Sequence, residues 1–133
     1  MKGQCLCQAV IIETMDNHEL HACHCGNCRK WGGSAGFTFA TQGIDIKGKD
    51  NMTSYQMVAW GTRNFCKVCG THLYFHQLGT DNYYVSAGLF DDMDFKLASQ
   101  IFIDKKACYY ELANDTSKLT ESEFITMLTD GCK

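Results

Sequence analysis

Several features that are common in proteins are missing from this sequence, and each absence narrows the possible functions. The 133 residues include no proline, so the turns must rely on Gly, Asn and Asp for unusual backbone dihedrals. No stretch approaches the roughly 18 consecutive apolar residues that a membrane span needs. The opening residues 1–4 carry no apolar signal peptide. We therefore expect no membrane partner and no secretory leader.

An excess of basic charge is also missing. The formal net charge is −3 and the isoelectric point is about 5.9. A protein that grips the phosphate backbone of nucleic acid usually presents a basic surface. We therefore expect no nucleic-acid partner.

Cysteine, in contrast, is abundant and unevenly distributed. Seven of the nine cysteines fall within the first 69 residues, in three tight groups: Cys5-x-Cys7, Cys23-x-Cys25-x-x-Cys28 and Cys66-x-x-Cys69. Zn²⁺ binds four thiolate or imidazole ligands in a tetrahedron, and closely spaced cysteines present two thiolates from one turn. Seven thiolates are enough for one closed four-cysteine site and one three-cysteine site with an open position.

A disulfide framework is the alternative explanation for so many cysteines. The odd count argues against it, and CxC or CxxC neighbours cannot easily all form bridges without strain. The chain is also 45% hydrophobic, which is enough to build a core without covalent cross-links. We favour zinc, with the protein in a reducing cytoplasm where the thiolates stay available to metal.

Two distributions of the cysteines remain open at this stage. In the first, the two CxxC pairs form a zinc ribbon, although the 37 residues between them exceed the roughly 15–20 that are usual. In the second, the CxC pair and the last CxxC pair share one ion: Cys5, Cys7, Cys66 and Cys69. The other ion is then bound by the remaining group: Cys23, Cys25 and Cys28. Spacing alone does not separate these alternatives.

Strand geometry explains how the two cysteines of a CxC pattern could bind the same ion. Alternate residues of an extended chain face the same side, so Cys23 and Cys25 can bind one ion together. His24 then points to the opposite face, which favours a structural role over proton transfer. Cys28 is expected to return from the turn that follows. Gly70, just after the last CxxC pair, is free to adopt a positive φ.

Short β-strand patterns dominate the rest of the chain. Runs rich in β-branched or aromatic residues, or alternating between apolar and polar residues, predict strands. They are 9–14, 36–41, 44–47, 54–59, 72–76, 83–87 and 99–103. Glycines lie between these runs or at their ends, as turn residues should.

Helix is expected only toward the C-terminus. Residues 120–123, Thr-Glu-Ser-Glu, form a capping box, and Phe124 and Leu128 would supply the apolar stripe of the helix. Residues 105–113 carry a weaker pattern for one or two helical turns. Since typical domains have about 100–150 residues, we predict a single, mostly-β domain over residues 1–133.

Three segments carry a resemblance to a known family. They are Gly3-Gln4-Cys5-Leu6-Cys7, Cys23-His24-Cys25-Gly26-Asn27-Cys28-Arg29-Lys30-Trp31-Gly32-Gly33-Ser34, and Phe65-Cys66-Lys67-Val68-Cys69-Gly70-Thr71-His72-Leu73. The order and spacing of all seven cysteines resemble those of the glutathione-dependent formaldehyde-activating enzyme (Gfa)/CENP-V family. The resemblance extends from about residue 3 to about residue 111.

The resemblance implies a β-tent (Mss4-like) fold of antiparallel sheets that holds two zinc ions per chain. It also favours the second distribution of the cysteines. The structural zinc would be held by Cys5, Cys7, Cys66 and Cys69. The zinc of the active site would be held by Cys23, Cys25 and Cys28.

The expected function is that of a zinc-dependent carbon–sulfur lyase acting on a small thiol adduct similar to S-hydroxymethylglutathione. Arg29 directly follows the second cysteine group, and its planar guanidinium matches a substrate carboxylate. The alternative is a non-catalytic zinc-binding scaffold of β-tent fold that binds a protein partner. Such a scaffold has little need for a zinc site with an open position.

Some residues outside the motifs also receive a prediction. Cys108 is expected to be a buried, small apolar residue, and Cys132 a thiol of the tail with no assigned role. Phe37 and Phe39 share one face of a predicted strand, so both are expected in the core.

Overall fold

The computed structural model describes residues 1–91 and 93–130. Strands make up most of its regular structure, so the predicted mostly-β fold class is confirmed. The chain divides into two compact units. The first unit comprises residues 1–18 and 38–95, and the second comprises residues 19–37 and 96–133. None of the helices in the described part of the chain is long and apolar enough to cross a membrane.

A small antiparallel sheet lies at the start of the first unit. β1 (Lys2–Gln4) pairs with β2 (Ile11–Glu13), which pairs in turn with β5 (Asp45–Lys47). Ile12 is fully buried while Glu13 is exposed, because successive side chains of a strand face opposite sides. A Cβ atom at Gly3 would lie 2.9 Å from the ring of Phe90, so β1 needs glycine there.

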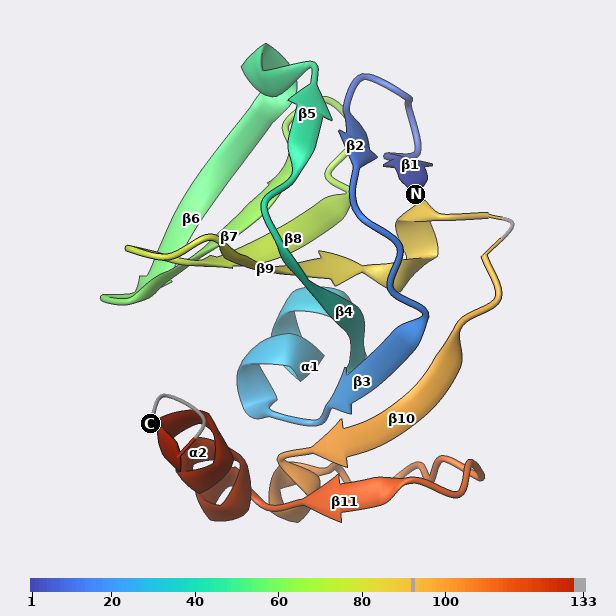
Figure 1. The fold of residues 1–133 in the computed structure, drawn as a ribbon, viewed down its shortest axis with the longest axis vertical. Helices are drawn as coiled ribbons and strands as arrows, with labels where there is room; N and C mark the ends of the chain where they lie inside the picture. The colour runs from blue at the N-terminus through green and yellow to red at the C-terminus, as the bar shows by residue number, and fades with distance from the viewer. Residues whose placement is uncertain (92, 131–133) are drawn as a thin grey trace. The chain divides into compact units, whose positions relative to one another are not determined.

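A second antiparallel sheet forms most of the first unit (Figure 1). β4 (Gly36–Gln42) enters this sheet from residue 38 onward, where it pairs with β9 (Asn82–Ser86). The sheet continues through β8 (His72–Gln77) and β7 (Gly61–Cys66) to β6 (Met52–Val58). The 3-10 helix η1 (Lys49–Asn51) precedes β6, and the 3-10 helix η2 (Ala87–Leu89) follows β9.

The core of the first unit is aromatic and aliphatic. Val85 on β9 is fully buried, as is Phe39 on β4. The ring of Phe39 contacts the rings of Phe90 and Phe95, with centroids 5.3 and 5.6 Å apart. The core position predicted for Phe39 is therefore confirmed. Phe37, predicted beside it, is 38% exposed, because it precedes the part of β4 that pairs with β9.

The strands of the second unit pair in parallel. β10 (Lys96–Ile101) runs parallel to β3 (Glu19–Cys23) and to β11 (Ser117–Leu119). A parallel pair needs a long crossover connection, and 72 residues separate β3 from β10. The family resemblance implied antiparallel sheets, so these parallel pairs were not expected, and the strand patterns of the sequence do not reveal which strands pair.

Both α-helices of the described residues belong to the second unit. The capping box is confirmed at the start of α2 (Glu121–Asp130), since the Glu123 amide donates to the Thr120 hydroxyl and the Thr120 amide donates to the Glu123 carboxylate. α1 (Gly26–Gly32) was not predicted. The helical turns predicted for residues 105–113 were wrong in position, because the 3-10 helix η3 spans Ile103–Lys105.

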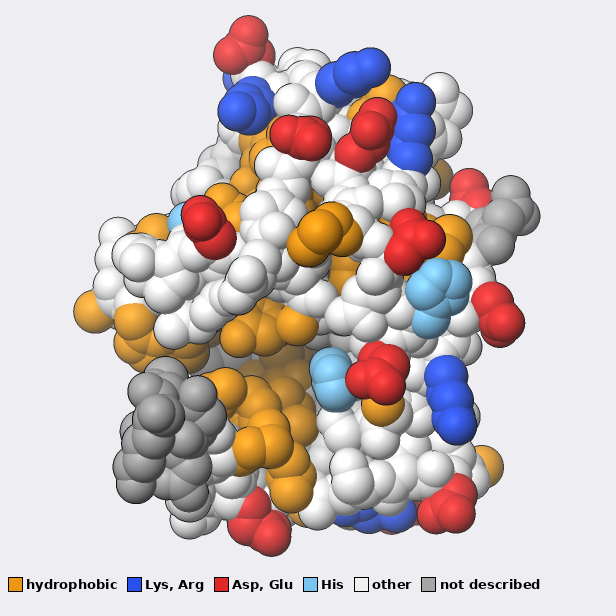
Figure 2. All heavy atoms as spheres, in the orientation of Figure 1, with side chains coloured by type: hydrophobic (Ala, Val, Ile, Leu, Met, Phe, Trp, Pro, Cys, Tyr) orange, Lys and Arg blue, Asp and Glu red, His pale blue; other side chains and the backbone are white. Residues whose placement is uncertain are grey.

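Charged side chains are mixed on the surface. On the face drawn in Figure 2, Asp and Glu side chains are scattered among Lys and Arg side chains rather than gathered apart from them. A mixed pattern of this kind creates no large region of one sign on that face.

A row of aromatic rings packs against a glycine of β7. Ring centroids are 5.5 Å apart between Trp60 and Phe75, and 6.1 Å apart between Phe75 and Tyr84. A Cβ atom at Gly61 would lie only 2.0 Å from the Phe75 ring. The ring of Phe75 therefore occupies the space that a side chain at residue 61 would need.

We expect Gly61→Ala to lower the free energy of unfolding by about 1–3 kcal/mol, the usual cost of overpacking, because the methyl group would displace the Phe75 ring. Urea unfolding measures this change. Gly88→Ala is the matched control, since nothing lies within 4 Å of a Cβ atom at Gly88. Equal stability of the two variants would contradict this account of the aromatic row.

Candidate metal centres

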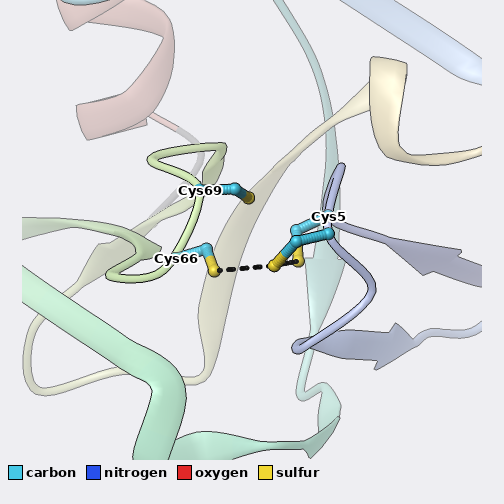
Figure 3. Close-up of side chains that lie close together, drawn as sticks. Cys5, Cys66 and Cys69 are labelled. Atoms are coloured by element: carbon cyan, nitrogen blue, oxygen red, sulfur yellow. Dashed lines mark hydrogen bonds between the residues drawn. The ribbon is translucent and has the colours of Figure 1, made fainter.

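Four cysteines of the first unit come together, and we call them the four-cysteine cluster: Cys5, Cys7, Cys66 and Cys69. Their sulfurs all lie within 4.8 Å of one another. The Cys7 Sγ atom is 3.7 Å from the Cys5 Sγ atom and 3.7 Å from the Cys66 Sγ atom. Figure 3 shows the side chains of Cys5, Cys66 and Cys69 turned toward one another.

Two tight loops present these four sulfurs. The loop after β1 carries Cys5 and Cys7, and the loop from the end of β7 carries Cys66 and Cys69. Each cysteine pair is followed directly by a residue in the left-handed region, Gln8 with φ 67° and Gly70 with φ 81°. The positive φ at Gly70 was expected from the sequence, whereas at a non-glycine residue such as Gln8 it is uncommon.

Thr71 links the two loops. Its hydroxyl oxygen accepts a hydrogen bond from the Leu6 amide at 3.1 Å and lies 3.1 Å from the Cys69 Sγ atom. Because the oxygen accepts from Leu6, the hydroxyl hydrogen is available for Cys69. This hydrogen bond lowers the pKa of Cys69 to about 5, since it stabilises the thiolate.

The second unit holds the three-cysteine cluster: Cys23, Cys25 and Cys28. Cys23 ends β3, Cys25 is the N-cap of α1, and Cys28 lies in the first helical turn, where its amide donates to the Cys25 Sγ atom at 3.3 Å. The three sulfurs lie within 4.8 Å of one another. The turn predicted before Cys28 is therefore the start of a helix.

Crowding changes the acidity of these thiols. Hydrogen bonds donated by Cys23 and then by Cys28 lower the pKa of Cys25 to about 2. The pKa of Cys23 is raised, first by its hydrogen bonds with Cys25 and Cys28 and then by burial. One sulfur thus ionises easily at the expense of the others. Ionising all three requires a cation that offsets their mutual repulsion.

The four-cysteine cluster has the sulfur spacing of tetrahedral thiolate coordination. Zn–S bonds of about 2.3 Å place two ligand sulfurs about 3.8 Å apart in a tetrahedron. The 3.7 Å sulfur–sulfur distances of the four-cysteine cluster match this value. Within the described residues, these two groups of cysteines could therefore bind metal ions, one with four ligands and one with three. This grouping corresponds to the second of the two distributions considered above.

Arg29 and Lys30 lie on α1. Arg29 is half-buried, and its Nη2 atom would be 3.7 Å from a Cβ atom at Gly26. The guanidinium therefore folds back toward the end of α1 that carries Cys28. Lys30 is exposed and projects about 100° away from Arg29 around the helix axis. The helix therefore separates the two basic side chains.

His24 is buried, with only 1% of its surface exposed. Its Nε2 atom lies 2.8 Å from the Gln100 Oε1 atom, and its Nδ1 atom is hydrogen-bonded to the Tyr110 hydroxyl. The structural role expected for His24 agrees with these contacts. Sequence reasoning missed Gln100 and Tyr110, because neither belongs to a motif.

The other two cysteines lie outside both clusters. Cys108 is exposed, so its predicted burial was wrong. It falls in a turn between η3 and β11, where no strand or helix carries it into a core. Cys132 lies outside the described residues.

The fold and these clusters define a class of protein: a mostly-β protein in which one group of four cysteines and one group of three cysteines could each bind a metal ion. The family model described as glutathione-dependent formaldehyde-activating enzyme matches residues 1–105. The chain belongs to this family, as the resemblance predicted. It is also 35% identical over 126 residues to an uncharacterized lyase of Schizosaccharomyces pombe, with 92% of each chain covered. At the level of the family, the protein is a lyase.

A solved structure shares the fold. The crystal structure of a Rhodobacter sphaeroides protein superposes with a TM-score of 0.59 at 25% identity. The match covers 70% of this chain and 90% of the other.

We expect Thr71→Val to weaken metal binding at the four-cysteine cluster by about 10–100-fold, the usual cost of losing a hydrogen bond to a ligand. Competition with a chromophoric chelator measures the affinity. Thr71→Ser keeps the hydroxyl and is expected to retain it. If Thr71→Ser loses as much affinity as Thr71→Val, the methyl group of Thr71 matters and the hydroxyl does not.

Proposed function

We propose that this protein is a zinc-dependent carbon–sulfur lyase that acts on a small thiol adduct resembling S-hydroxymethylglutathione. The observation that carries the proposal is the three-cysteine cluster, in which Cys23, Cys25 and Cys28 supply three ligands from one short segment. A closed structural zinc site uses four protein ligands, whereas a catalytic site uses three and leaves one position for substrate. The four-cysteine cluster of the same chain supplies the structural counterpart.

The cysteines determine what the open position accepts. The chemistry that zinc supplies when bound to such ligands is stabilisation of a substrate thiolate near neutral pH, from a group whose free pKa is about 8.5. Cys23, Cys25 and Cys28 come from one short segment and would hold the ion with three sulfurs. The fourth position is thereby left for the sulfur of the substrate.

The reaction itself needs no redox cofactor. In the hydroxymethyl thioether, the C–S bond breaks and its electron pair stays on sulfur. The hydroxyl proton leaves as the C=O bond of formaldehyde forms, and one proton is transferred to the thiol product overall. The description of the family and the lyase name of the Schizosaccharomyces pombe relative support this type of reaction.

Arg29 is the residue that we propose to bind the far end of the substrate. Its half-buried guanidinium lies at the end of α1 that carries Cys28. A guanidinium binds a carboxylate through two parallel hydrogen bonds, and glutathione has two carboxylates. The contact would orient the thiol toward the open ligand position.

The remaining parts of the proposal follow from the same chemistry. We propose two zinc ions per chain, a single domain over residues 1–133 and a cytoplasmic location, where thiolates stay reduced. A non-catalytic scaffold that binds a protein partner would need the four-cysteine cluster alone. The three-cysteine cluster therefore favours the enzyme.

Two cysteine variants test this division of roles. We expect Cys66→Ser to unfold or aggregate the protein, because structural zinc binding contributes directly to folding. Cys25→Ser is expected to stay folded, to retain about one zinc instead of about two, and to lose release of formaldehyde from hydroxymethyl thiol adducts. Zinc content, circular dichroism and the formaldehyde assay measure these changes. Full activity of a folded Cys25→Ser would refute the proposed lyase site.

The role of Arg29 has its own test. We expect Arg29→Ala to weaken substrate binding by about 1.5–3 kcal/mol, the scale of a hydrogen bond to a charged group, with unchanged zinc content. The Michaelis constant for a glutathione adduct measures the loss. Lys30→Ala is the control, since Lys30 points elsewhere on α1. A larger effect in Lys30→Ala would show that the wrong basic residue has been assigned.

A further inference from the structure

Within the second unit, a chain of hydrogen bonds extends away from the three-cysteine cluster. It begins at the Tyr110 hydroxyl, passes through the imidazole of His24 and the amide of Gln100, and ends at the Thr116 hydroxyl. Three of these four side chains lie far from the cysteines in sequence. His24, in contrast, stands between Cys23 and Cys25.

The donors and acceptors of this chain follow from its members. The Gln100 Nε2 atom donates to the Thr116 Oγ1 atom at 3.1 Å, so the Gln100 Oε1 atom faces His24 as an acceptor. The His24 Nε2 atom must then carry the hydrogen. In a neutral imidazole the other nitrogen is an acceptor, so the Tyr110 hydroxyl donates to the His24 Nδ1 atom. Every polar atom of the imidazole is satisfied.

The backbone of His24 is held by β10, the strand that also carries Gln100. Its amide donates to the Ile101 carbonyl at 3.1 Å, which extends the pairing of β3 with β10 beyond Cys23. Gln100 is the residue before Ile101 on β10. The main chain and the side chain of His24 are therefore both fixed to the end of one strand.

Tyr110 is held from its other side by Lys106. The Lys106 Nζ atom donates to the Tyr110 carbonyl and lies 4.9 Å from the centroid of the Tyr110 ring. It also pairs with Glu111 at 3.0 Å. The hydroxyl of Tyr110 is thus directed at His24 by a fixed segment.

We propose that Tyr110 is a positioning residue that, through His24, sets the orientation of Cys23 and Cys25 as metal ligands. Successive residues of an extended chain point to opposite sides, so a rotation of the backbone at His24 would turn both flanking sulfurs. Hydrogen bonds to both nitrogens of the His24 imidazole therefore also fix the direction of the Cys23 and Cys25 side chains. The inference depends on the proposed metal-binding role of the three-cysteine cluster. Groups that orient ligands commonly matter nearly as much as the ligands themselves.

This role differs from general stabilisation of the fold. Tyr110 is only half-buried, and it lies beyond residues 1–105, the part matched by the family model. Its hydroxyl is hydrogen-bonded to His24, the residue between Cys23 and Cys25. Its loss should therefore change the three-cysteine cluster and leave the four-cysteine cluster as it was.

The test is metal affinity in Tyr110→Phe, which removes only the hydroxyl. We expect metal binding at the three-cysteine cluster to weaken by about 10-fold or more, with unchanged binding at the four-cysteine cluster. The melting temperature should fall by no more than the weaker metal binding accounts for. Chelator competition separates the two sites. In cobalt-substituted protein, the thiolate-to-cobalt charge-transfer band of the weaker site should shift. Tyr109→Phe is the matched control, since Tyr109 is 68% exposed.

A double-mutant cycle adds a second measurement. His24→Gln keeps an amide group near the Nε2 position, facing Gln100, but loses the partner of Tyr110. If Tyr110 acts through His24, adding Tyr110→Phe to His24→Gln should cause no further loss of affinity. Full additivity of the two changes would overturn the inference.

The other outcomes are also decisive. If wild-type protein binds metal at both clusters and Tyr110→Phe matches it, this inference fails while the proposed function stands. If Tyr110→Phe weakens metal binding at both clusters to the same extent and also lowers the melting temperature, Tyr110 supports the fold in general, and the inference fails. Wild-type protein that binds no metal at the three-cysteine cluster would overturn the proposed function and this inference together.

Discussion

Repulsion between thiolates is the constraint on which the rest of this structure depends. Two unit charges 4 Å apart repel by about 4 kcal/mol at an effective dielectric constant of 20, and each cluster brings its sulfurs within 4.8 Å. The clusters differ in what a bound cation would tie together. The four-cysteine cluster joins loops whose contacting cysteines are 59 residues apart, so cation binding there closes a long segment of chain. The three-cysteine cluster spans six residues, so cation binding there would close almost none of the chain.

Much of the fold was predictable, because local patterns determine most of its strands. The alternation at residues 36–41 corresponds to β4, and the capping box at residue 120 begins α2. β7 was missed because Arg63 and Asn64 are both buried, which breaks the alternation that marks a half-buried strand. α1 was missed because a seven-residue helix rich in glycine carries no apolar stripe. The parallel pairing of β10 was not predictable, since strand patterns carry no information about distant partners.

The candidate site also has a part that was predictable from local sequence patterns and a part that was not. Ligand spacing is a local property, so the sequence could indicate which cysteines act together once the family resemblance was added. Thr71 adjoins a cysteine motif but supports it through Leu6, which is 65 residues away. Gln100 and Tyr110 reach His24 across 76 and 86 residues. Contacts over such separations arise from the fold and have no signature in the sequence. The two groups of cysteines were therefore predictable, and the distant residues hydrogen-bonded to Leu6 and His24 were not.

The CxC pattern connects the local spacing of the cysteines with the contacts between distant residues. Where the chain is extended, the alternation that points Cys23 and Cys25 to one side also points the side chain between them, that of His24, to the other. In the loop after β1 that middle residue is Leu6, which is 85% exposed and anchored through its amide alone. In the three-cysteine cluster it is a buried histidine with two side-chain partners. Under the proposed function, the site with three protein ligands would gain from such an anchor, because groups that hold a ligand in place support metal binding.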